Sequence, residues 1–199
     1  MKLRISSLVQ KMIFTDGITI GYNLLIILLT LAFSSQLRGI VQYLILHLVF
    51  ITISVLLISF IGEKHPGWLQ LVRHIYPLAF LGNFYAETDF FNNLFSQNLD
   101  SYFIAAETDL FGSLPSVLFY KNFSQLWFSE LMNFGYFSYY LLLAGFSIWM
   151  FFYQKQHFQK AFGILILSFL LYYIIFIFLP VAGPQYALPY PDNAIGNEG

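Results

Sequence analysis

Cysteine is absent from the 199 residues of this chain, and charged residues make up only 10% of it. The first absence excludes disulfides, thiolate catalysis and metal sites held by cysteine. The second leaves the chain with less than half of the charge of a soluble domain, about 25%. Nine basic residues stand against ten acidic ones, so no positive excess favours nucleic acid as a partner. Because 58% of the residues are apolar, we expect a lipid bilayer to be the main solvent and partner of the chain.

Long uncharged stretches predict the membrane-spanning helices. A helix needs about 20 mostly apolar residues to cross roughly 30 Å of hydrocarbon. Four stretches meet this requirement and predict spans at about 18–37, 39–61, 131–153 and 161–179. A fifth span at about 68–86 is more polar, and we expect Arg73 near its end to extend to the headgroups; a re-entrant or interfacial helix is the alternative there. The sequence therefore predicts an all-α, polytopic membrane bundle of about five transmembrane helices plus interfacial helices, forming a single membrane domain over 1–199.

The distribution of basic residues predicts the orientation. With five spans and a cytoplasmic N-terminus, seven basic residues lie inside and two outside, as the positive-inside rule requires. The inner group is Lys2, Arg4, Lys11, Lys64, Arg73, Lys155 and Lys160, and the outer pair is Arg38 and Lys121. This arrangement makes the chain a multi-pass protein with an exterior C-terminus, an exterior aromatic segment at 87–126 and an exterior tail at 181–199.

Few residues carry the patterns of known chemistry. His47 lies in mid-span, where an ionisable group is a functional candidate, but no carboxylate is within helical reach. We therefore favour a neutral imidazole bonded to a neighbouring helix. Four acidic residues either form a solvated acidic rim at the outer face, which we favour, or bind a cation there: Glu87, Asp89, Glu107 and Asp109. No histidine or carboxylate group has metal-ligand spacing, so the sequence predicts neither a metal nor a cofactor.

Two segments at the outer ends of the predicted spans combine polar groups with helix signals. Glu130 is expected to begin a helix, where the helix dipole stabilises a carboxylate, and Tyr136 follows with its hydroxyl just inside the membrane. An aromatic belt with interhelix hydrogen bonds also explains these residues, and on the residues alone we favour it. After the last span, Gly183 allows backbone to approach a ligand, and Gln185 follows it. By itself this second segment is also a helix terminator.

These segments resemble one family of membrane enzymes. The relevant runs are Trp-Phe-Ser-Glu-Leu at 127–131, Tyr-Phe-Ser-Tyr-Tyr at 136–140 and Phe-Leu-Pro-Val-Ala-Gly-Pro-Gln at 178–185. Arg73-x-x-Tyr-Pro-Leu, Phe84-Tyr85-x-Glu87-Thr88 and Leu99-Asp100 with Phe111-Gly112-x-x-Pro115 agree with it. Together they are similar to the inositol phosphorylceramide synthase-like (aureobasidin-resistance) branch of the type-2 phosphatidic acid phosphatase superfamily, over roughly residues 70–190.

The resemblance implies metal-independent phosphoryl transfer on a lipid headgroup at the non-cytoplasmic face. In the family, the catalytic histidines lie in a Pro-Ser-x-His and a later His-x-x-x-Asp motif, both after the Gly-Pro segment. This sequence holds neither motif, and the family's Lys-x6-Arg-Pro motif is also missing. We therefore expect the N-terminal half of such an enzyme, with no catalytic residue in this chain. The implied substrate-binding residues are Glu130, Tyr136, Gly183 and Gln185.

Two other hypotheses remain open. The chain is alternatively a non-catalytic membrane scaffold or lipid-binding subunit that docks a partner through its exterior aromatic segment. A small transporter is disfavoured because no predicted span carries a central acid–base pair. The sequence does not determine the lipid substrate, the choice between hydrolysis and transfer, or the oligomeric state.

Overall fold

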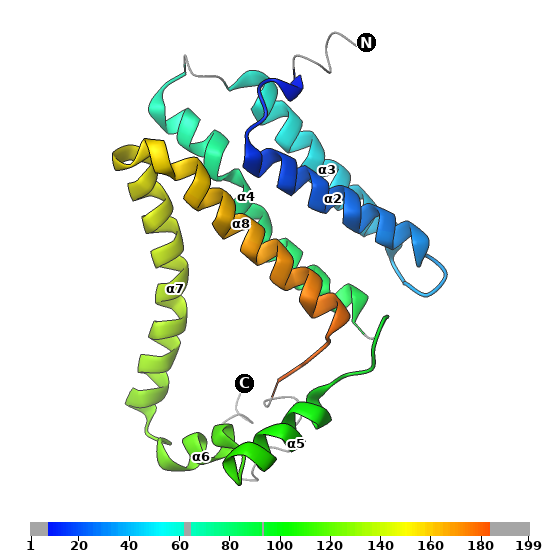
Figure 1. Ribbon diagram of the computed structural model, residues 1–199, viewed down its shortest axis with the longest axis vertical. Coiled ribbons are helices and arrows are strands. Elements are labelled where there is room, and N and C mark those ends of the chain that lie inside the picture. Colours follow the sequence, from blue (N-terminus) through cyan, green and yellow to red (C-terminus); the bar gives the residue numbers. More distant parts are fainter. Residues whose placement is uncertain (1–7, 62–64, 93, 184–199) are drawn as a thin grey trace. The chain divides into compact units, whose positions relative to one another are not determined.

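The computed structural model describes residues 8–61, 65–92 and 94–183, and every regular element in them is helical (Figure 1). The α-helices are α2 (Phe14–Ala32), α3 (Ile40–Phe60), α4 (Gly67–Glu87), α5 (Asp100–Phe111), α6 (Pro115–Asn122), α7 (Leu126–Tyr153) and α8 (Lys155–Phe178). A short 3-10 helix, η1 (Thr88–Phe91), follows α4 directly. The all-α prediction is confirmed for the described residues. The chain divides into two compact units, 1–91 with 141–175, and 92–140 with 176–199.

The first unit is built around helices α2, α3 and α4, each of which contacts the other two. Helix α8 packs alongside, through the ring contact of Tyr85 with Tyr173 and through a close approach to α2 at Gly163. A Cβ at Gly163 would lie 2.6 Å from the Phe14 ring, so glycine is what allows these two helices to approach. The core of this unit is strongly aromatic, with Phe50, Phe80 and Phe84 in mutual ring contact.

Four of the described helices are long and apolar enough to cross a membrane: α2, α3, α7 and α8. They correspond to the four uncharged stretches of the sequence, and the prediction of four spans is confirmed at that level. Helix α4 is not among them, although its 21 residues would measure about 32 Å at 1.5 Å per residue. The fifth span therefore stays a prediction.

Three helices begin before the membrane spans that the sequence predicts within them, and each extension has the same cause. Helix α2 begins four residues earlier than expected and includes Asp16, α7 begins five earlier, and α8 begins six earlier and includes Lys155 and Lys160. Each predicted span begins just after a charged residue, and the helix extends back through that residue. A helix continues through a charged residue whose side chain finds a partner or extends to water, so charge marks where the hydrocarbon ends and not where the helix ends.

The second unit contains two short helices in the region predicted as the exterior aromatic segment. Asn98 accepts a hydrogen bond from the Asp100 backbone N–H at 2.7 Å at the start of α5, and Gly112 ends the helix with a φ of 71°. This left-handed conformation favours glycine, as is usual just after a helix. Helix α6 begins at Pro115, a residue well suited to a first helical position. The predicted short helices are confirmed, and their place at the membrane interface stays a prediction.

Candidate functional site: buried polar clusters and an anchored loop

Asp16 forms a buried cluster that joins α2 to α4. Its Oδ1 atom accepts hydrogen bonds from Arg73 Nη1 at 2.8 Å and from the Tyr76 hydroxyl at 3.0 Å. Its Oδ2 atom accepts the Ile13 backbone N–H at 2.9 Å, and Arg73 Nη2 bonds to the same oxygen. Asp16 is fully buried and Arg73 is 5% exposed. The carboxylate thus caps the first turn of α2. It also neutralises the buried Arg73 guanidinium in a bidentate ion pair.

The expectation that the Arg73 side chain reaches the headgroups was wrong. An arginine extends to water when nothing inside the bundle offers a counter-charge. Here the start of α2 presents Asp16 to the facing side of α4, and the ion pair compensates for burial. Sequence reasoning missed this pair because the two residues are 57 positions apart.

His47 forms a second buried cluster, which joins all three helices of the core. Its Nδ1 atom lies 2.7 Å from Asn23 Oδ1 on α2, and its Nε2 atom bonds to Glu87 Oε1 at the end of α4. His47 is fully buried and Glu87 is 2% exposed. The ring stacks on Phe84 with centroids 6.1 Å apart and meets the edge of Phe50 at 6.3 Å. This aromatic enclosure excludes solvent from the pair.

The hydrogen bonds fix how protons are distributed in this cluster. Asn23 Nδ2 donates to the Thr19 carbonyl at 2.8 Å, so Asn23 Oδ1 is left to accept a proton from His47 Nδ1. One further proton then lies between His47 Nε2 and Glu87 Oε1. Whether that proton belongs to the ring or to the carboxyl group, the pair has no net charge. A neutral pair is the form that a buried acid and base adopt at lowest cost.

Two predictions about these residues need correction. The bond from His47 to a neighbouring helix is confirmed, but a carboxylate also reaches it, from a different helix. Glu87 is not part of a solvated acidic rim, because it is buried against His47. This unit also holds two buried acid–base pairs, which local sequence patterns did not predict.

The buried face of α2 is polar along most of its length. Thr15, Asp16, Thr19, Asn23 and Thr30 all lie on it, each at 2% exposure or less. Buried atoms without a hydrogen-bond partner among the described residues include Thr19 Oγ1, the Tyr22 hydroxyl and Glu87 Oε2. Leaving such an atom unsatisfied costs about 1–3 kcal/mol, and internal water is its usual partner. The side of α2 that faces the core is therefore polar, whereas the rest of the core is mostly aromatic.

In the second unit, Asp100 anchors the loop that follows α8. Its Oδ1 atom accepts the backbone N–H groups of Ala182 at 3.1 Å and of Gly183 at 3.0 Å. The Leu99 N–H donates to the Pro180 carbonyl at 3.0 Å beside them. Gly183 has a φ of 92°, which favours glycine. The segment after α8 is thus more than a helix terminator, because a carboxylate from α5 holds its backbone in place.

Replacing Asp100 by Ala is expected to release this loop. Burial raises the pKa of Asp100, but the hydrogen bonds from Gly183, Asn98 and Ala182 outweigh it and lower the pKa below the ordinary value of 3.8. A lowered pKa in the folded state stabilises the loop fully above the ordinary value, and this contribution is lost as the pH falls through the lower pKa. Hydrogen exchange of the Ala182 and Gly183 amides should accelerate about tenfold in the variant at neutral pH.

The matched control is Asp109→Ala, which removes an exposed carboxylate from the same helix. It should leave both amides protected. Equal exchange in Asp100→Ala and in the unchanged protein would show that the carboxylate does not hold the loop.

The predicted substrate-binding residues are not joined into one site by hydrogen bonds between the described members. Glu130 is exposed in the second turn of α7 and does not begin that helix, which corrects its predicted role as a helix-start carboxylate. Tyr136 is 69% exposed and its hydroxyl lies 3.1 Å from that of Tyr140. No hydrogen bond links Glu130, Tyr136 and Gly183 to one another within the described chain. Gln185 lies outside the described residues.

The known proteins give no counterpart for this geometry. Comparison of the chain with models of protein families, with curated proteins and with solved structures finds no match. Among residues 8–61, 65–92 and 94–183, no three histidine, aspartate or glutamate side chains are grouped closely enough to hold a metal ion. The functional assignment therefore depends on the residues themselves.

Proposed function

We propose that this chain is the N-terminal part of an integral-membrane lipid phosphatase or phosphotransferase that acts on phospholipid or sphingolipid headgroups at the non-cytoplasmic face. One observation carries the proposal. The family resemblance depends partly on Leu99-Asp100 and partly on the segment 178–185, which are some 80 residues apart. In the structure these two segments bond to each other through Asp100, Ala182 and Gly183. Contact between segments chosen for their family likeness supports a shared site.

In this proposal the chain supplies a scaffold and a lipid-facing surface. The anchored loop fixes the path of the chain after α8, which is where the family's histidine motifs follow. Glu130, Tyr136, Gly183 and Gln185 are proposed to lie near the lipid headgroup. No cofactor or metal is required, because the family's nucleophile is a histidine.

The proposed topology has five spans, a cytoplasmic N-terminus and an exterior C-terminus. Helix α4 is the fifth span, and its ion pairs support this role. Arg73 and Glu87 are its buried charged residues, and each is paired with a residue of α2 or α3. Pairing removes most of the cost of placing charge in hydrocarbon. The seven-to-two division of basic residues supports the orientation.

The test reads the gene downstream of codon 199 and assays its complete product. We expect an in-frame Pro-Ser-x-His motif followed by His-x-x-x-Asp, and metal-independent release or transfer of phospho-headgroups from lipid vesicles. The 199-residue polypeptide alone should show no turnover. A stop codon after Gly199 would favour the alternative, a non-catalytic scaffold or lipid-binding subunit, and turnover by residues 1–199 alone would contradict the division of roles.

A further inference from the structure

A cavity of about 520 Å³ opens in the first unit, at the end of the helices opposite to Glu87. Four segments line it: the residues before α2, the end of α3, the first turns of α4 and the first turns of α8. Lys11, Arg73 and His74 are its basic members, and Gln10, Gln70 and Gln159 contribute amides. Aspartate and glutamate are absent from this described lining. The cavity therefore collects hydrogen-bond donors and positive charge from distant parts of the chain.

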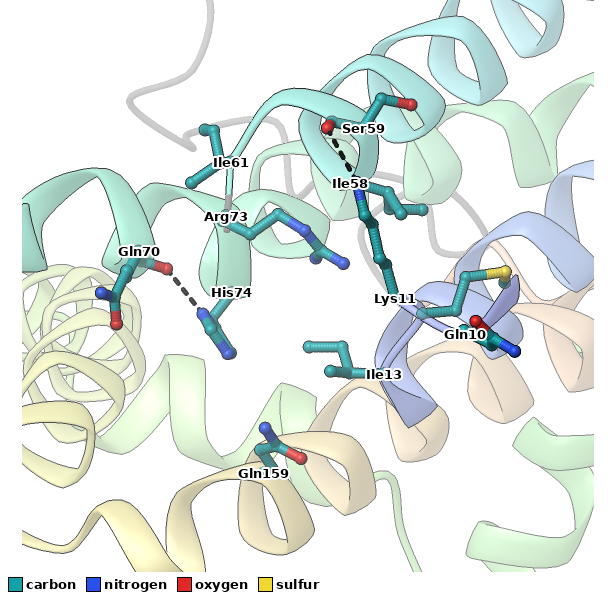
Figure 2. A pocket seen from close by; sticks show the side chains of 11 residues that line it. Gln10, Lys11, Ile13, Ile58, Ser59, Ile61, Gln70, Arg73, His74 and Gln159 are labelled. Atoms are coloured by element: carbon teal, nitrogen blue, oxygen red, sulfur yellow. Dashed lines mark hydrogen bonds between the residues drawn. The ribbon is translucent and has the colours of Figure 1, made fainter. Parts of the chain in front are cut away.

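The hydrogen-bond donors of the cavity differ in how strongly they already bond to other groups of the chain. The Arg73 guanidinium is already neutralised by its ion pair with Asp16, so this side chain mainly lines the cavity and is not its charged contact. The Lys11 ammonium has one hydrogen bond within the described residues, to the Ser59 carbonyl at 3.5 Å, which is the outer limit for such a bond. His74 Nδ1 donates to the Gln70 carbonyl at 2.6 Å. Figure 2 shows the Gln159 amide group directed toward the same space from α8.

This combination fits an anion with several acceptor oxygens. Lysine binds phosphate as a point charge, and amide N–H groups complete its hydrogen bonds. No carboxylate among the described lining residues repels an anion. The rest of the lining is mostly Met12, Ile13, Ile58 and Ile61, which suits a ligand with an apolar part. The cavity also lies where α2 and α8 begin and α3 ends, the level at which membrane headgroups meet apolar helices.

We propose that this cavity binds the phosphate group of an anionic phospholipid, drawn from the leaflet at that end of the helices. Lys11 makes the main charged contact, and Gln159 donates from the opposite wall. The inference does not depend on the proposed function, which is argued from the loop that Asp100 anchors in the second unit. In the proposed topology the cavity faces the cytoplasmic leaflet.

The test measures lipid binding to the full chain in neutral detergent by native mass spectrometry. Phosphatidylglycerol should bind about tenfold more tightly than phosphatidylcholine with the same acyl chains. Lys11→Gln should weaken phosphatidylglycerol binding about tenfold, the size expected for one charge-assisted hydrogen bond, and Lys11→Arg should restore it. Gln159→Glu should weaken it similarly by placing a carboxylate opposite the lysine. Both positions are exposed, so these variants keep the fold.

Lys160→Gln is the matched control, because it removes the same charge beside Gln159 without touching the cavity lining. It should change the dissociation constant less than twofold. Equal weakening by Lys11→Gln and Lys160→Gln would reduce the effect to general surface attraction and overturn the proposal. Displacement of the lipid by inorganic phosphate, with the same dependence on Lys11, would make this a site for a soluble phosphate and overturn its assignment to a lipid.

Discussion

Replacing Asp16 by Ala is expected to destabilise the α2–α3–α4 core by about 3–5 kcal/mol, the cost of leaving one partner of a buried ion pair uncompensated. The carboxylate accepts two hydrogen bonds from Arg73, one from Tyr76 and one from the Ile13 backbone, so its removal leaves four donor groups without their acceptor. The free energy of unfolding, measured by titration with a denaturing detergent, checks the prediction.

A second variant separates the ion pair from the helix cap. In Asp16→Ala combined with Arg73→Met, no charged group remains in this cluster, so much of the lost stability should return. Asp89→Ala is the control, because it removes an exposed carboxylate from the same unit and should change stability by less than about 0.5 kcal/mol. If the double variant is as unstable as the sum of the single ones, the pair does not act as a unit.

The second large effect is expected at His47. His47→Leu leaves the Glu87 carboxylate buried in an aromatic enclosure without its partner and should cost about 3–5 kcal/mol. Glu87→Gln should cost far less, about 1 kcal/mol, because a glutamine amide still donates a hydrogen bond to a neutral ring. Unfolding in the same detergent titration ranks the two variants.

His157→Leu is the matched control for His47→Leu, since it makes the same change at an exposed position in α8. It should be within about 0.5 kcal/mol of the unchanged protein. Equal losses in Glu87→Gln and His47→Leu would mean that a full charge is needed at Glu87 and that the pair is not a neutral unit sharing one proton.

The sequence predicts the helices of this protein better than their ends. Span 39–61 agrees with α3 to one residue at each end, because polar and turn-forming residues flank an unbroken apolar run. The sequence predicts that Glu130 begins a helix, yet it lies inside α7; Asp16, which precedes the predicted span 18–37, lies inside α2. An apolar run indicates which residues lie in the hydrocarbon layer. Where the helix itself ends depends on capping residues and on side-chain partners that are distant in the sequence.

The buried clusters were beyond what local patterns reveal. His47 signals a need for a partner, since an ionisable group in a span rarely stays unpaired. Nothing near it indicates that the partner is Glu87, 40 residues away, because that choice depends on how α3 and α4 are aligned. In contrast, Asp100 and Gly183 were both in the segments singled out by family likeness, although their contact was not foreseen.

The two buried pairs have a consequence for biogenesis. Helix α4 is the most polar of the five proposed spans, and a lone arginine costs about 2.5–3.5 kcal/mol at the centre of a membrane helix. Its partners Asp16 and His47 belong to α2 and α3, which are synthesised first. In the proposed topology, α2 and α3 would enter the membrane before α4, so Asp16 and His47 would be available as partners for its arginine and its glutamate. Under that proposal, the hairpin of α2 and α3 would favour insertion of the helix that follows it.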